Sequence, residues 1–132
     1  MVATGSVVSE ALVAADLLSA RGVSASVVNM HTLVPLDEVA IQAVARSSDL
    51  VVTLEEHSIC GGLGSAVAES LAESGTHVRL SRLGVRGSYP HAGDYRHLLD
   101  QCGLTGERIA DHVSQSLGIF PKQNSQALSV TR

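Results

Sequence analysis

The chain of 132 residues has few charged side chains, no basic cluster and no long apolar run. Charged residues make up 17% of it, against about a quarter in typical soluble domains. Its 9 Lys and Arg residues are scattered among 13 Asp and Glu residues, so nucleic acid is not expected as a partner. No apolar stretch approaches the roughly 20 residues of a membrane span, and no signal-like basic start follows Met1. We therefore expect no membrane partner and a cytoplasmic location.

Cysteine and histidine are also too sparse or too scattered for a metal or disulfide framework. Cys60 and Cys102 are too few for a disulfide scaffold and lack zinc-like spacing, so we expect two reduced thiols. The six histidines lack the four-residue pairing of a helical zinc site; they stand at positions 31, 57, 77, 91, 97 and 112. The sequence therefore predicts no metal site.

Hydrophobic residues, 45% of the chain, follow alternating helix and strand patterns. Helical spacing or helix-capping signals mark residues 6–20, 37–46, 63–74, 95–101 and 105–117. Residues 23–29 are rich in valine, 50–54 form a continuous apolar run, and 77–83 alternate; these patterns are typical of strands. We expect 50–54 at the centre of the sheet and 77–83 at its edge. The order predicts an α/β fold, a three-layer α/β/α sandwich with a mainly parallel sheet.

The two ends of the chain differ from this pattern. A first strand would span only residues 1–4, shorter than the five or six residues usual for strands. Either the chain is the back portion of something longer, or another polypeptide completes this strand. From Gly118 the sequence is polar and aperiodic, so we divide the chain into a domain over residues 1–117 and a loose polar tail over 118–132.

The turn after the central strand is the candidate functional site. In an open parallel sheet, the carboxyl ends of the strands and the N-termini of the following helices attract anions. We therefore predict an anion site with outward-pointing amides near the start of the helix at Leu63. Its residues are His57, Gly62, Leu63, Gly64 and Ser65.

Simpler interpretations of the same turn stay open. The glycines can serve only a tight turn, with Glu56 accepting hydrogen bonds from nearby backbone N–H groups and His57 lying on the rim or in an interface. A dinucleotide-binding fingerprint needs a third glycine at position 67, where this chain has Val67, so the turn matches that fingerprint only weakly. No nucleophile or metal set accompanies the acidic residues, so we assign no catalytic, cofactor-binding or metal-binding residue.

Several separated motifs lie, in order, at residues 3–6, 10–11, 29–37, 51–57, 61–69, 82–85 and 103–105. Together they resemble the C-terminal domain of the transketolase family of thiamine diphosphate enzymes. The resemblance runs from Val2 to about Val113 and departs at residues 86–93, where only Tyr89 and Gly93 keep the expected character. The contacts that this loop makes in relatives are therefore in doubt for this chain.

The resemblance implies the C-terminal domain or small subunit of a ketol-transferring transferase. In such enzymes thiamine diphosphate and Mg²⁺ are held by other domains, so the resemblance implies that this chain binds neither and is inactive alone. Its implied role is structural, dimer-stabilising or regulatory. The implied partners are the thiamine-binding domains or subunit of the same enzyme and further copies of the chain, as a dimer or other homo-oligomer.

Alternative functions remain open from the sequence. Within the family, transketolase is favoured over deoxyxylulose-phosphate synthase and the dehydrogenase E1 beta-type subunits. Outside it, the chain would be a stand-alone anion- or metabolite-binding module that uses the turn at residues 61–65, or a dimerisation module. A neighbouring reading frame that encodes thiamine-binding domains would favour the first hypothesis.

Overall fold

A computed structural model of the chain describes residues 1–87 and 92–119. Its four strands are β1 (Val2–Ala3), β2 (Val28–Asn29), β3 (Leu50–Ser58) and β4 (Arg79–Val85). All pair in parallel, in the order β2-β1-β3-β4. The predicted parallel sheet is confirmed, with β3 inside it and β4 at an edge.

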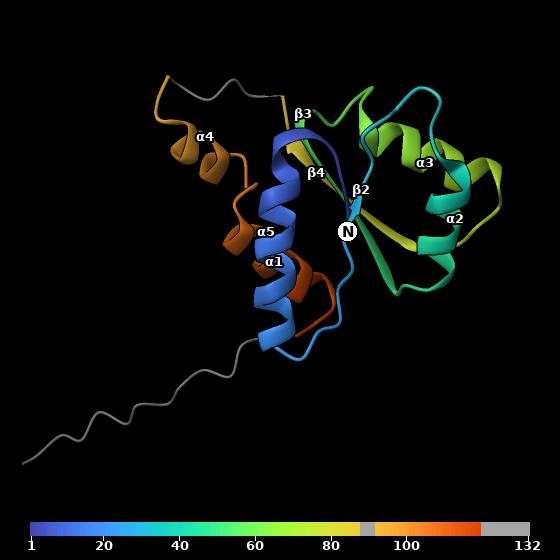
Figure 1. The fold of residues 1–132 in the computed structure, drawn as a ribbon, viewed down its shortest axis with the longest axis horizontal. Coiled ribbons are helices and arrows are strands. Elements are labelled where there is room, and N and C mark those ends of the chain that lie inside the picture. Colours follow the sequence, from blue (N-terminus) through green and yellow to red (C-terminus); the bar gives the residue numbers. More distant parts are fainter. Residues whose placement is uncertain (88–91, 120–132) are drawn as a thin grey trace, which may run out of the picture.

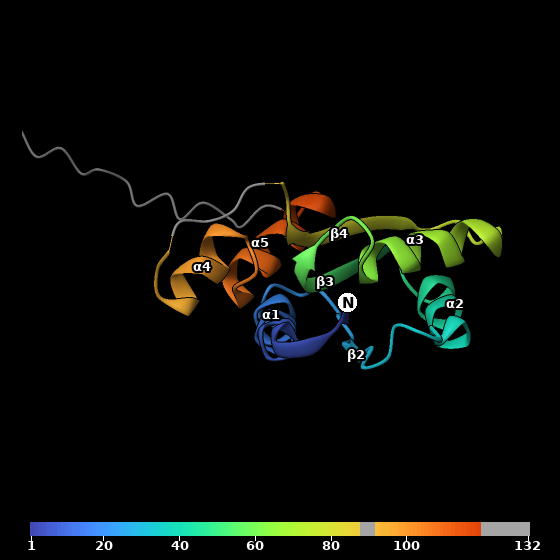
Figure 2. The same cartoon turned by 90° about the horizontal axis from the view of Figure 1, so that it is seen from above.

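Helices cover both faces of this sheet. They are the 3-10 turn η1 (Gly5–Val7), then α1 (Val8–Ala20), α2 (Glu38–Arg46), α3 (Leu63–Glu73), α4 (Tyr95–Gln101) and α5 (Gly106–Ser116). Figures 1 and 2 show α1, α4 and α5 on one side of the sheet and α2 and α3 on the other. The predicted three-layer sandwich is confirmed.

Two apolar clusters hold the layers together, one on each face. The first joins Val52 and Leu54 of β3 to α1 and α5, where Leu18 and Ile109 are fully buried. The second joins Val51 of β3 to α2 and α3. Successive strand residues point to opposite faces, so a strand buried in both clusters needs a continuous apolar run. The run at residues 50–54 meets that need.

Two local details differ from the sequence-based expectation. The strand predicted over residues 23–29 is paired only at Val28 and Asn29, because the residues of β1 that pair with it are just Val2 and Ala3. Thr105 stands at the N-cap of α5 as predicted, but its side chain makes no capping bond. Instead, Glu10 of α1 accepts the Gly106 N–H at 2.6 Å.

Two predicted features fall partly outside the described residues. The divergent loop at residues 86–93 includes positions 88–91, and the predicted tail includes positions 120–132. Among the residues that the structure does describe, no helix is both long enough and apolar enough to cross a membrane.

Candidate functional site

Glu55 closes the turn between β3 and α3. Its side chain is 1% exposed, although it lies near the carboxyl end of the strand. One carboxylate oxygen, Oε2, accepts the Leu63 N–H at 2.8 Å, and the other, Oε1, accepts the Gly64 N–H at 2.8 Å. Both donors belong to the first turn of α3, where the helix dipole favours negative charge. Glu55 is therefore an internal cap for this helix.

Two glycines make room for this arrangement. A Cβ atom on Gly62 would lie 1.8 Å from the Glu55 Oε2 atom, so no side chain fits there while the carboxylate is in place. A Cβ atom on Gly64 would lie 2.8 Å from the Arg82 side chain and 2.9 Å from the Thr53 hydroxyl. The glycines thus let the start of α3 approach β3 and β4 closely.

The side chains of Ser65 and Arg82 hydrogen-bond to the loop between β3 and α3. The Ser65 hydroxyl accepts the Gly61 N–H at 2.9 Å and donates to the Ile59 carbonyl at 3.1 Å. The Arg82 guanidinium, which reaches across from β4, donates to the same Ile59 carbonyl at 3.1 Å and to the Ser65 hydroxyl at 3.4 Å. The Ser65 hydroxyl is therefore engaged within the loop, with a cation beside it.

Glu56 and His57 lie on the exposed rim of the turn. Glu56 accepts hydrogen bonds from the Ser6 hydroxyl and, at 2.8 Å, from the Tyr95 hydroxyl. It thereby joins β3 to the start of the α1 layer and to α4. The His57 ring lies in solvent, with Nδ1 3.2 Å from the Ser58 carbonyl oxygen. This rim links three elements without enclosing a ligand.

The structure brings the predicted residues together but arranges their donors differently. The expectation that the backbone N–H groups of Leu63 and Gly64 point outward is wrong, because the Glu55 carboxylate accepts both of them. The alternative interpretation, in which Glu56 accepts backbone N–H groups, named the wrong residue. Glu55, the residue before it, accepts those hydrogen bonds. An external anion would compete with this carboxylate, and anion binding at the turn stays a prediction.

The sequence does contain a signal for this cap. Two glycines with one residue between them follow Glu55 at seven and nine positions, which indicates a close approach of the backbone to that side chain. Sequence reasoning missed Glu55 because β3 is covered on both faces, so alternation alone does not show which of two adjacent carboxylates is buried. Within residues 1–87 and 92–119, no three His, Cys, Asp or Glu side chains gather closely enough to hold a metal ion.

Comparison with known proteins identifies similar chains. The family model described as "Transketolase, C-terminal domain" matches residues 1–109. A putative transketolase C-terminal section from Methanocaldococcus jannaschii is 42% identical over 117 residues, which cover 89% of this chain and 36% of that protein. A 6-deoxy-6-sulfo-D-fructose transketolase subunit from Clostridium sp. is 44% identical over 109 residues, covering 83% of this chain and 34% of that protein.

Other similar proteins include a synthase and a solved structure. A 1-deoxy-D-xylulose-5-phosphate synthase from Thioalkalivibrio sulfidiphilus is 40% identical over 116 residues, covering 88% of this chain and 18% of the synthase. A solved structure described as a split-gene transketolase, an inactive beta4 tetramer, matches with a TM-score of 0.78 and 40% identity, covering 89% of this chain and 37% of that one. The chain thus spans about a third or less of these relatives.

Proposed function

Because the chain belongs to the transketolase C-terminal domain family, we propose that it serves as the C-terminal domain or small subunit of a thiamine diphosphate-dependent, ketol-transferring enzyme. Its role there is structural, dimer-stabilising or regulatory, and it carries out no catalysis alone. Its partners are the thiamine-binding domains or subunit of the same enzyme, together with further copies of this chain. We also propose a cytoplasmic location, where free thiols such as Cys60 and Cys102 persist.

One part of this proposal is that the chain alone carries out no catalysis. The observation that supports this part is the internal cap on α3. A diphosphate needs free backbone donors at a helix N-terminus, with positive charge beside them. At the one such turn singled out by the sequence, the Glu55 carboxylate accepts two of these donors and adds negative charge. The residues present do not fit a diphosphate, so we assign this chain no step that involves thiamine diphosphate or its Mg²⁺.

Thermal unfolding and an activity assay test the proposal. The isolated chain should show no ketol transfer and no rise in melting temperature with thiamine diphosphate and Mg²⁺, since a ligand that binds the folded state raises it. Mixing with the polypeptide that carries the thiamine-binding domains should give a stable complex and activity. A clear rise in melting temperature for the isolated chain with thiamine diphosphate would refute the proposal.

A 1-deoxy-D-xylulose-5-phosphate synthase role is the second candidate, favoured by the 40% identity to such a synthase over 116 residues. The two roles differ in the donor from which the carbon fragment is taken. The same reconstituted complex is assayed with a ketose phosphate as donor and, separately, with pyruvate. Turnover with the ketose phosphate alone supports the transketolase role, and turnover with pyruvate alone supports the synthase role.

A further inference from the structure

Strand β4 forms one edge of the sheet, and part of its backbone is unpaired. The order β2-β1-β3-β4 places β3 on one side of β4 and no other described strand on its far side. Figure 2 shows β4 and β2 at opposite rims of the sheet. The unpaired N–H and C=O groups of an edge strand are a template on which another extended segment can pair.

The backbone groups of β4 that face away from β3 follow from its hydrogen bonds. The Ile59 N–H donates to the Val85 C=O at 3.2 Å, so Val85 faces the β3 side. In a strand, the N–H and C=O of one residue point to the same side, and that side alternates along the chain. The backbone groups of Leu80 and Arg82 therefore point away from β3. The Arg86 side chain donates to the Arg82 C=O at 2.8 Å, as this outward direction allows.

The side chains along this edge alternate between two helices. Arg79 and Ser81 contact α5 through hydrogen bonds. Arg82 contacts α3 in the same way, and Leu80 packs against the apolar cluster of α2 and α3. Residues 83–84 are buried, so the accessible part of the edge is residues 79–82.

The charge at this edge has a single sign. Arg79, Arg82 and Arg86 donate hydrogen bonds to carbonyl or hydroxyl oxygens, and none of the three forms an ion pair with a described residue. Charged side chains on an edge strand commonly keep other strands away. Because these charges are all positive, they repel a basic segment and attract an acidic one.

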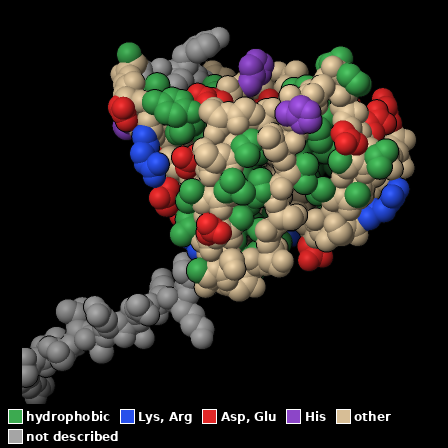
Figure 3. Space-filling view, in the orientation of Figure 1, with side chains coloured by type: hydrophobic (Ala, Val, Ile, Leu, Met, Phe, Trp, Pro, Cys, Tyr) green, Lys and Arg blue, Asp and Glu red, His purple; other side chains and the backbone are tan. Residues whose placement is uncertain are grey.

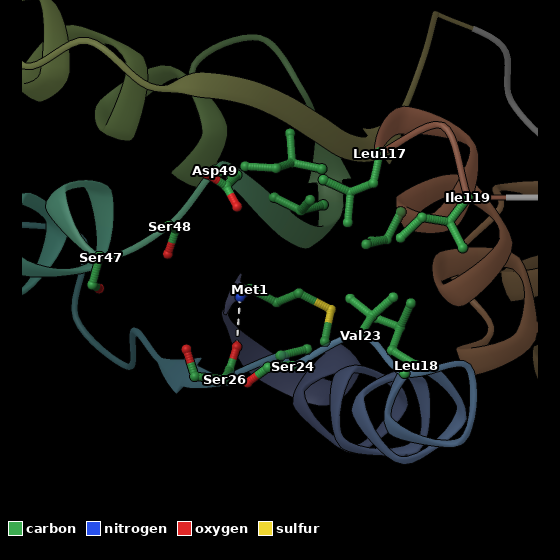
Figure 4. A pocket seen from close by; sticks show the side chains of 15 residues that line it. Met1, Leu18, Val23, Ser24, Ser26, Ser47, Ser48, Asp49, Leu117 and Ile119 are labelled. Atoms are coloured by element: carbon green, nitrogen blue, oxygen red, sulfur yellow. Dashed lines mark hydrogen bonds between the residues drawn. The ribbon is translucent and has the colours of Figure 1, made fainter.

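This edge is separate from the first residues of the chain. Met1 borders a cavity of about 610 Å³ at the amino-terminal end of the sheet, which Figure 4 shows from close by. β1 and β4 pair with opposite sides of β3, and residues 79–85 of β4 do not line that cavity. The unpaired groups of β4 are therefore not those next to the first residue.

We propose that residues 79–82 of β4 are a docking site for an extended acidic segment of a partner polypeptide, which pairs with this edge as a further strand. Antiparallel pairing is slightly more stable per residue than parallel pairing, and it sets the segment opposite residues 82, 81, 80 and 79 in turn. Acidic side chains fit opposite Arg82 and Arg79, and an apolar one fits opposite Leu80. Backbone pairing gives the affinity, and the pattern acidic, polar, apolar, acidic gives the specificity.

A capped peptide, Thr-Glu-Thr-Val-Glu-Thr, tests the site on the full chain. At a peptide concentration of about ten times its Kd, we expect amide hydrogen exchange at Leu80 and Arg82 to slow by about tenfold, because only the unbound chain exchanges freely. The same peptide methylated at its valine nitrogen cannot donate to the Leu80 C=O, so it should bind about tenfold more weakly. Unchanged exchange at both amides, or equal binding of the two peptides, would overturn the strand pairing.

Charge reversal tests the choice of an acidic occupant. Arg79→Glu should raise the Kd of the acidic peptide by about fivefold, because an attractive charge pair becomes a repulsive one. The matched control is Arg46→Glu, at an exposed arginine of α2 that bonds to Gln42, and it should leave the Kd unchanged. Equal Kd values for Arg79→Glu and the original chain would overturn the charge selection. Neither measurement needs the thiamine-binding domains, so its outcome is independent of the proposed function.

Discussion

Glu55 connects β3 to α3 through two hydrogen bonds, which its carboxylate accepts from the Leu63 and Gly64 N–H groups. Replacing it with alanine leaves two buried N–H donors without this acceptor. Hydrogen bonds to charged groups are worth about 1.5–3 kcal/mol each, so the loss of both should lower the free energy of unfolding of Glu55→Ala by about 3–6 kcal/mol. Urea denaturation measures the loss. The matched control is Glu56→Ala. It removes an exposed carboxylate whose two donors, the Ser6 and Tyr95 hydroxyls, are exposed and can bond to water instead, so it should cost under about 1 kcal/mol.

Gly62→Ala provides a second measurement of the same contact. Its new Cβ atom would lie 1.8 Å from the Glu55 Oε2 atom, so the carboxylate must move. In the Glu55→Ala background that conflict is gone, so the substitution should cost much less there than in the unmodified chain. Additive losses in the double variant would mean that Glu55 and Gly62 do not share this contact.

The predicted anion site depends on the same two donors. Because Glu55 competes with an external anion, we expect sulfate to bind the turn more tightly in Glu55→Ala than in the unmodified chain. An NMR titration with sulfate follows the amides of residues 57–66. Larger shifts in the variant support the site. Shifts elsewhere, with none in this loop, would mean that the glycines serve only the turn.

A histidine contact joins strand β4 to helix α5. The His112 ring nitrogen Nε2 lies 2.7 Å from the Ser81 hydroxyl. Burial of the ring, with a smaller effect of the Arg86 charge, lowers the pKa of His112 from its usual value. A lowered pKa means that the folded state prefers the neutral ring. The histidine therefore contributes stability above its unfolded pKa, near 6.5, and that stability is lost as the pH falls toward the lowered pKa of the folded state.

This linkage predicts a pH dependence that depends on the histidine. The unfolding midpoint in urea should fall between pH 7.5 and pH 5, and His112→Gln should reduce this fall. His97→Gln, which changes an exposed histidine of α4, is the matched control and should leave the fall unchanged. Identical pH profiles for the original chain and His112→Gln would contradict the assignment.

Helices α1 and α5 pack closely because Gly106 has no side chain. A Cβ atom there would lie 2.5 Å from the Val13 Cγ1 atom and 3.2 Å from the Glu10 carbonyl oxygen. We expect Gly106→Ala to lower the free energy of unfolding by about 1–3 kcal/mol, the usual cost of overpacking. Adding Val13→Ala should recover only part of this loss, because it removes the Cγ1 atom but keeps the Val13 Cβ atom, which would lie 2.7 Å from the new one. An unchanged loss in the double variant would show that the contact with Val13 Cγ1 is not what costs stability.

For the whole molecule, the small share of charged residues and the exposed apolar side chains on α1 favour association of the chain with further copies of itself. The face shown in Figure 3 has hydrophobic side chains across its middle, and Leu12 of α1 is 54% exposed. We expect sedimentation to show concentration-dependent self-association, which Leu12→Glu should weaken. Val39→Glu, at an exposed valine of α2, is the matched control and should have little effect. A monomer at every concentration would contradict this expectation.

The sequence by itself determined the order of the elements and the layered sheet. Helix and strand periodicities are local properties, and the run at residues 50–54, apolar except for Thr53, is expected only where both faces of a strand are covered. The cap of α2 was equally local, because the Asp37 side chain accepts the Ala40 N–H three residues later at 2.9 Å. The motif spacing likewise predicted the family that the comparisons confirm.

Contacts between residues far apart in the chain required the tertiary structure. Glu55 and Glu56 are adjacent and chemically identical, and only the position of α3 over one face of β3 buries the first of them. Glu10 caps α5 from a position 96 residues away, which no local pattern encodes. The pairing of β2 is limited to two residues by the length of β1, not by its own valine-rich sequence. Propensity sets what a segment can form, whereas the neighbour that accepts its hydrogen bonds decides what it does form.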